Sequence, residues 1–241
     1  MNKTTNIAVL TATAALLTSS TARAQTPGVA ETGFLNVSIA AQTQSRDLST
    51  SSTFPLYGET ARIASAQRIG SGPVFDVSGG YRFKPAFAVG IGVSTFSRSA
   101  TGTILASIPN PLVFNRPVNV SVEQSGLKHS ELGVHLMAIW FVPVTVNFDV
   151  MLSAGPSFTR VKQDIGTATV PAGTQNVSVA VESRTATAKG ANVGIAANYL
   201  FASHYGAGAF MRYVGGSVDF PEATGVKVAG FQIGAGVTVR F

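Results

Sequence analysis

The chain has 241 residues, of which 45% are hydrophobic and only 12% charged, so it is too apolar for a disordered protein and fits one ordinary domain. It contains no cysteine, which excludes disulfides, thiol catalysis and a lipid-modified N-terminal cysteine. The net charge is +6, and it falls to +4 without Lys3 and Arg23 of the N-terminal segment described next. The other cations are scattered along the sequence, so nucleic acid is not an expected partner.

The first predicted element is a secretory signal peptide over residues 1–24. Lys3 gives a positive start, Ile7–Leu17 an apolar core, and Ala22-Arg23-Ala24 a small-residue cleavage site. The apolar core is much shorter than the roughly 20 residues that a spanning helix needs. We therefore expect residues 1–24 to be cleaved and residues 25–241 to form a single exported domain.

Eight later segments alternate apolar side chains with small or polar ones, which is the two-residue period of strands that have one apolar face. In the last segment the apolar positions run from Phe231 to Phe241. A bulge is expected in the fifth, at Gly155-Pro156, because proline cannot donate to a ladder. The predicted strands are Gly33–Thr43, Pro73–Phe83, Ala86–Phe96, Lys128–Phe141, Val144–Phe158, Lys189–Tyr199, Tyr205–Val214 and Lys227–Phe241.

The two faces of these strands indicate where lipid lies. Most apolar faces are aliphatic bands, and most glycines lie on the opposite face, where a narrow barrel is crowded. A water-soluble barrel would instead carry charges outside and bulky side chains within. We predict an all-β fold, an eight-stranded antiparallel transmembrane β-barrel with its apolar face toward lipid.

The connections between the predicted strands are alternately short and long. Short ones lie around Lys84-Pro85, Val142-Pro143 and Leu200–His204, and the long ones span roughly residues 44–72, 97–127, 159–188 and 215–226. This asymmetry is typical of outer-membrane barrels, which have short periplasmic turns and long extracellular loops. The even number of strands brings both chain ends to the short-turn side.

Parts of the long connections have patterns of their own. Val118, Val120 and Val122 continue the alternation of the fourth strand, and Val177, Val179 and Val181 that of the sixth. We expect these two strands to project past the membrane as paired ribbons. The segments FPLYGE (54–59) and SIPNPLVFNRP (107–117) carry apolar residues that either pack within the loops or form a partner surface.

Aromatic residues gather near the short turns of the predicted barrel. Amphipathic rings concentrate at membrane interfaces, so they are expected to form a girdle at the periplasmic side. The predicted members are Tyr81, Phe83, Phe87, Trp140, Phe141, Tyr199, Tyr205 and Phe241.

Charged residues on the polar faces form a predicted interior cluster. An isolated charge in a narrow lumen is costly, so Arg212 is expected to pair with Glu131 or Asp76. The pairs either plug the barrel or act as a gate for water and small ions; the plug is favoured because side chains fill an eight-stranded interior. The predicted cluster is Asp76, Arg82, Glu131, His135, Asp149 and Arg212.

Catalytic and cofactor motifs are not expected. His129, Ser130 and Glu131 are the only cluster that could suggest a hydrolase, but on one strand Ser130 faces away from its neighbours. Three histidines without cysteine make a weak metal-ligand set. We therefore predict no catalytic residue, no metal and no cofactor.

Two local motifs carry a resemblance to a known family. GGYRF (79–83) and the terminal VTVRF (237–241), together with the signal peptide, resemble small bacterial outer-membrane β-barrels, such as the transmembrane domain of outer membrane protein A and the "porin family" group. The resemblance implies an outer-membrane location and a monomer. It also implies contact with outer-membrane lipid and lipopolysaccharide, and with the barrel-assembly machinery through the strand ending at Phe241.

The expected function is a non-enzymatic surface or envelope scaffold whose loops bind a partner that the sequence does not identify. The first alternative is a narrow passive pore for small solutes or ions. The second is an outer-membrane enzyme that modifies lipid A.

Overall fold

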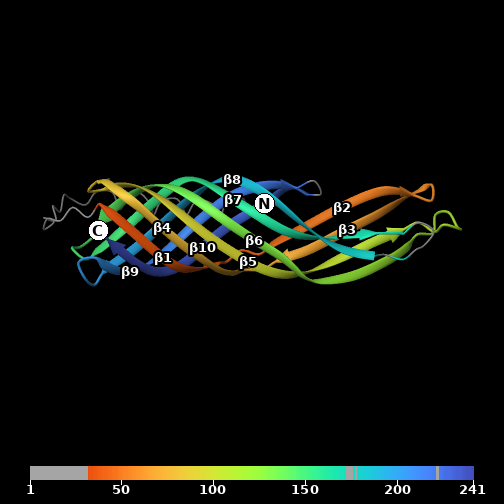
Figure 1. Cartoon of the computed structure of the whole chain (residues 1–241), viewed down its shortest axis with the longest axis horizontal. Coiled ribbons are helices and arrows are strands. Elements are labelled where there is room, and N and C mark those ends of the chain that lie inside the picture. The colour runs from red at the N-terminus through yellow and green to blue at the C-terminus, as the bar shows by residue number, and fades with distance from the viewer. Residues whose placement is uncertain (1–31, 172–175, 177, 221–222) are drawn as a thin grey trace, which may run out of the picture.

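The computed structural model describes residues 32–171, 176, 178–220 and 223–241 (Figure 1), so the predicted signal peptide lies outside the described residues. The described chain forms antiparallel strands. They are β1 (Gly33–Gln42), β2 (Arg46–Leu56), β3 (Glu59–Ile69), β4 (Gly72–Lys84), β5 (Phe87–Ile108), β6 (Val118–Pro143), β7 (Phe148–Thr169), β8 (Ser178–Leu200), β9 (Tyr205–Phe220) and β10 (Ala223–Arg240).

Eight of these strands close a ring. β1 pairs with both β4 and β10, β5 pairs with both β4 and β6, and β6 to β10 follow in sequence order. Closure leaves each ring strand with a partner on both sides, as a backbone in lipid requires. The ring strands are the eight that the alternation pattern predicts, so the eight-stranded antiparallel barrel is confirmed.

The segment between β1 and β4 is not a loop. It folds as the hairpin β2–β3 with a turn at Tyr57-Gly58, where both residues have positive φ angles of 53° and 76°. β3 then pairs with the far part of β5, through Arg62–Gln67 and Gly102–Ser107. Figure 1 shows this hairpin at the end of the barrel opposite the C-terminus. The expectation of a long loop here is wrong, because Ile63 buries apolar surface against Ile104 and Ala106 of β5.

The other long connections are also mostly strand. β5, β6, β7 and β8 have 22, 26, 22 and 23 residues, whereas about 9–11 suffice to cross a membrane. The extra length pairs β5 with β6 and β7 with β8 up to their far ends. The predicted paired ribbons are therefore present, although Val177 lies outside the described residues. Only residues 109–117 separate β5 from β6.

A bulge in β6 changes which face its valines occupy. The β5–β6 register shifts beside Gly126, which has a φ of 77°. Beyond the shift, Val120 and Val122 stand opposite Ala106 and Ile104, whose side chains point inward and are buried. The expectation that these valines keep the outward parity of the strand is wrong, because one extra residue reverses a two-residue period. The β7–β8 register has no such shift, but Val179 near its far end packs against Ile104 and the other buried residues around it rather than facing outward.

The bulge predicted at Gly155-Pro156 is absent, since the β6–β7 register is the same on both sides of it. The two backbones instead come so close that a Cβ on Gly155 would lie 2.1 Å from the carbonyl oxygen of Leu136. The side-chain amide of Asn192 donates to the carbonyls of Leu136 and Gly155 at 3.3 and 3.0 Å. Pro156 has no N–H to donate to the ladder, and the Asn192 amide supplies donors to the backbone carbonyls at this point.

The barrel wall is apolar outside and polar inside. Val37, Ile91 and Leu136 are 47, 52 and 43% exposed, whereas Asp76 and His135 are 4 and 1% exposed. This is the reverse of a water-soluble barrel and fits a wall solvated by lipid. Among the described residues there is no helix of the length and hydropathy that crossing a membrane requires.

Candidate functional site

The lumen is filled by layers of paired polar side chains, and the first lies near the short turns. Arg240 of β10 donates to Asp149 of β7, whose other carboxylate oxygen accepts from Asn198 at 3.1 Å. The guanidinium carbon of Arg82 stands 3.9 Å from the centre of the Phe141 ring. The layer thus joins side chains from five different strands across the barrel.

The predicted aromatic girdle needs one correction. Phe141 is 3% exposed and points into the barrel, because it follows the outward-facing Trp140 on a strand whose faces alternate. On the outer wall, Trp140 stacks on Phe87 with ring centres 6.4 Å apart. The other predicted members all have exposed rings: Tyr81, Phe83, Phe87, Trp140, Tyr199, Tyr205 and Phe241.

The second layer is built around Arg212 of β9. Its guanidinium Nη2 lies 2.6 Å from Asp76 Oδ2, and Nε and Nη2 donate to Gln232 at 3.1 and 2.8 Å. Gln232 in turn donates to Gln42 at 3.4 Å. Of the two acids expected to compete for Arg212, the structure thus selects Asp76. Both charged groups are about 5% exposed, so the pair is neutralised away from water.

A third layer is centred on His135 of β6. Its Nε2 and Nδ1 lie 2.8 Å from the hydroxyls of Ser94 and Ser157, and Asn192 donates to Ser157 at 2.9 Å. A serine beside a histidine suggests a nucleophile and a base, but here no carboxylate orients the histidine, and both serines are buried. We read this layer as structural.

The fourth layer ties the β2–β3 hairpin to the barrel. Arg46 of β2 reaches Glu131 of β6 at 2.6 Å, and the same carboxylate oxygen lies 2.8 Å from His129 Nε2. The other ring nitrogen of His129 bonds to Gln163 of β7. Ser130 is on the opposite face of β6, so His129, Ser130 and Glu131 do not meet as a triad. Sequence reasoning missed Arg46, because it lies in a segment predicted to be loop.

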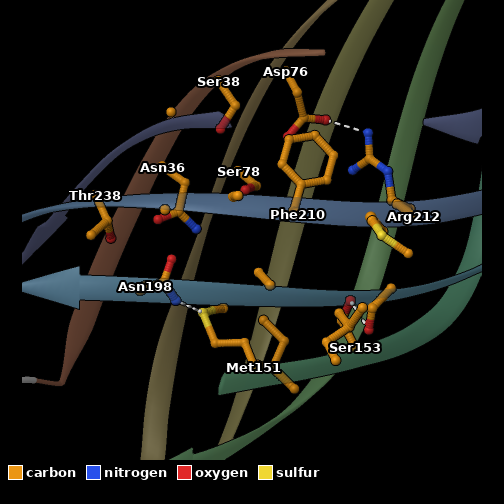
Figure 2. A pocket seen from close by; sticks show the side chains of 18 of the residues that line it. Asn36, Ser38, Asp76, Ser78, Met151, Ser153, Asn198, Phe210, Arg212 and Thr238 are labelled. Atoms are coloured by element: carbon orange, nitrogen blue, oxygen red, sulfur yellow. Dashed lines mark hydrogen bonds and ion pairs between the residues drawn. The ribbon is translucent and has the colours of Figure 1, made fainter. Parts of the chain in front are cut away.

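Space remains between the first two layers. The cavity there has a volume of about 70 Å³. Since one water needs roughly 10–15 Å³ counted in this way, the cavity accommodates only a few waters. Figure 2 shows its polar wall, with Asn36, Ser38, Ser78 and Thr238 around it and the Asp76–Arg212 pair at one side.

An apolar cluster fills the barrel's extension at its far end. Ile63 of β3 packs with Ile104, Ala106 and Ile108 of β5, all 8% exposed or less. Phe54 of β2 packs against this cluster. The extension therefore has a small hydrophobic core of its own. Within the described part of the chain, no three His, Asp or Glu side chains are grouped to hold a metal ion.

The architecture matches solved outer-membrane proteins. OprG from Pseudomonas aeruginosa superposes with a TM-score of 0.50 at 12% identity, covering 87% of this chain and 95% of that one. The fold is that of small outer-membrane β-barrels. The outer-membrane protease OmpT from Escherichia coli superposes with a TM-score of 0.46 at 11% identity, covering 86% of this chain and 97% of that one. Neisserial surface protein A superposes with a TM-score of 0.42 at 15% identity, covering 87% of this chain and 97% of that one. No protein-family model matches the sequence, and no curated protein does.

Proposed function

We propose that this chain is a non-enzymatic outer-membrane scaffold that holds a rigid, strand-built extension at the cell surface for interaction. The observation that carries the proposal is the filled lumen. Four polar layers, each with its own hydrogen bonds, are followed by an apolar core in the extension. A pore would need a continuous water-filled path along the axis, and the packed side chains of these layers and of the apolar core occupy that path.

The tip of the extension supports the interaction role. Leu112 and Phe114, in the connection between β5 and β6, are 90 and 71% exposed. The connection is nevertheless ordered, because the backbone N–H of Asn115 donates to Glu59 of β3 at 2.7 Å. Exposed apolar side chains on an ordered segment are typical of a binding surface. Of the two apolar segments noted in the sequence, 107–117 provides this surface, whereas Phe54 of the other packs inward.

Conductance in planar bilayers tests the scaffold against the pore. The purified, folded protein is expected to give no current steps. The comparison variant carries Asp76→Ser and Arg212→Ser, which removes the second layer without a change in net charge. Current steps from the wild-type protein that change in size in this variant would locate conduction in the lumen and overturn the proposal.

The enzyme alternative has a separate test. Mass spectra of lipid A from cells with and without the protein are expected to be identical. A modification of lipid A that depends on the protein would contradict the non-enzymatic scaffold. Replacing His135 by Gln would then show where the chemistry lies: a modification that persists in this variant is performed by residues exposed on the extension, and one that is lost depends on the buried third layer.

A further inference from the structure

A group of cations on the outer wall begins where the apolar belt ends. On β7 the outward positions pass from Phe158 to Arg160 and then Lys162, all exposed. On β6, Leu132 is the last apolar residue of the outward-facing positions toward the extension, and the exposed Lys128 lies two outward positions beyond it. The change from apolar to cationic side chains therefore occurs at one level of the wall.

Strand register brings these cations together. Arg160 stands opposite Leu132, Lys162 opposite Ser130, and Lys189 of β8 opposite Phe158. Lys128 is thus the diagonal neighbour of Lys162, and Lys189 that of Arg160, at about 7–8 Å between backbones. We call Lys128, Arg160, Lys162 and Lys189 the basic cluster. Its members come from three strands and are up to 61 positions apart in the chain, which is why they look scattered in the sequence.

Ion pairs within the described part of the chain do not neutralise the basic cluster. Across the residues that the structure describes, none of its four charged groups forms an ion pair. The neighbouring carboxylate, Asp164, accepts instead from the backbone N–H of Lys128 and from the Ser183 hydroxyl. Lys227 adds a further cation at the same level, because Ser217 of β9 is opposite both Lys189 and Lys227. The result is a localised positive potential on one side of the barrel.

A ligand for this surface must combine anionic groups with acyl chains. Directly below the basic cluster, Leu132, Leu136 and Phe158 are exposed on the apolar wall. A soluble anion would use the cations alone, whereas an amphipathic lipid also covers the adjoining apolar side chains. The long arms of lysine and arginine can reach headgroup phosphates from this level.

We propose that the basic cluster binds the phosphorylated headgroup of an outer-leaflet glycolipid, the lipid A part of lipopolysaccharide, with its acyl chains along β6 and β7. The inference requires the outer-membrane location but not the scaffold role, so the conductance test leaves it unaffected. It implies one preferred lipid site on the barrel rather than uniform solvation of the wall.

Native mass spectrometry of the folded protein in detergent tests the site. The probes are bis-phosphorylated lipid A, the same lipid after phosphatase treatment, phosphatidylglycerol and inorganic phosphate. The cluster variant carries Lys128→Gln, Arg160→Gln, Lys162→Gln and Lys189→Gln. The matched control carries the same loss of charge at exposed cations elsewhere, with Arg62→Gln, Arg68→Gln, Lys84→Gln and Arg116→Gln. Heat-dependent gel mobility verifies that both variants are folded barrels.

The wild-type protein and the control variant are expected to bind bis-phosphorylated lipid A equally, and the cluster variant at least tenfold more weakly. Dephosphorylated lipid A is expected to bind all three proteins alike and weakly. Equal affinity of the cluster and control variants would overturn the site. Equal affinity for phosphatidylglycerol, or displacement of lipid A by inorganic phosphate, would overturn the assignment to glycolipid. If a variant does not fold, the four single substitutions are compared in its place.

Discussion

The Asp76–Arg212 pair of the second layer allows a quantitative test of how the lumen is held together. The two groups are 2.6 Å apart, with side chains 5 and 6% exposed. Removing one partner leaves the other charge buried alone, which costs about 3–5 kcal/mol. We therefore expect Asp76→Leu and Arg212→Met each to lower the free energy of unfolding by this amount. The double variant loses mainly hydrogen bonds to Gln232, worth about 1 kcal/mol each.

A double-mutant cycle isolates the coupling between these two residues. Unfolding by urea in lipid vesicles is followed through Trp140, the only tryptophan, which lies on the outer wall. The expected coupling energy is at least about 4 kcal/mol, the sum of the two single losses less that of the double variant. The control cycle uses Arg184 and Glu182, which form an ion pair with side chains 40 and 48% exposed. Exposed pairs couple by about 0.2–1 kcal/mol. A lumen coupling no larger than that of the exposed pair would refute the account of the second layer as a buried neutral pair.

Two further predictions follow from close contacts. Gly155→Ala is expected to prevent barrel closure, because the new Cβ would meet the Leu136 carbonyl at 2.1 Å. Gly70→Ala, with nothing within 4 Å, should leave the heat-dependent gel shift intact; equal shifts in both variants would contradict this. Arg46→Ala removes the contact with Glu131, so amide exchange of β2 and β3 is expected to accelerate at least about tenfold while β8 is unchanged. Unchanged exchange in the hairpin would show that its apolar core alone holds it.

Alternation along the chain was enough to predict the barrel. In the barrel-wall part of strands such as β5 and β10, every second side chain is apolar. This pattern can be recognised in the sequence because the odd or even position of a residue in its strand decides whether the side chain faces lipid or the lumen. The same reasoning identified Arg212 and Asp76 as interior charges. It failed at Phe141, where the aromatic character was given more weight than the parity of its strand.

The far end of the molecule was not predictable in this way. β2 and β3 look like loop because polar and charged residues interrupt their apolar alternation. The pairing of β3 with β5 depends on contacts between segments far apart in the sequence. The bulge at Gly126 reversed the parity of Val120 and Val122 through a single positive φ angle. No local sequence pattern predicts such a shift, because glycine also occurs throughout the regular strands and its presence does not mark a bulge.

The fold class, the strands of the ring and most of the side chains that face the lumen follow from the sequence alone, because they depend on the two-residue period and on the choice between lipid and water. The three-dimensional structure was needed to show which charges pair, that Arg46 joins Glu131, and that one surface holds Lys128, Arg160, Lys162 and Lys189. Those juxtapositions depend on the register between strands, which hydrogen bonds across the whole barrel set and no single segment encodes.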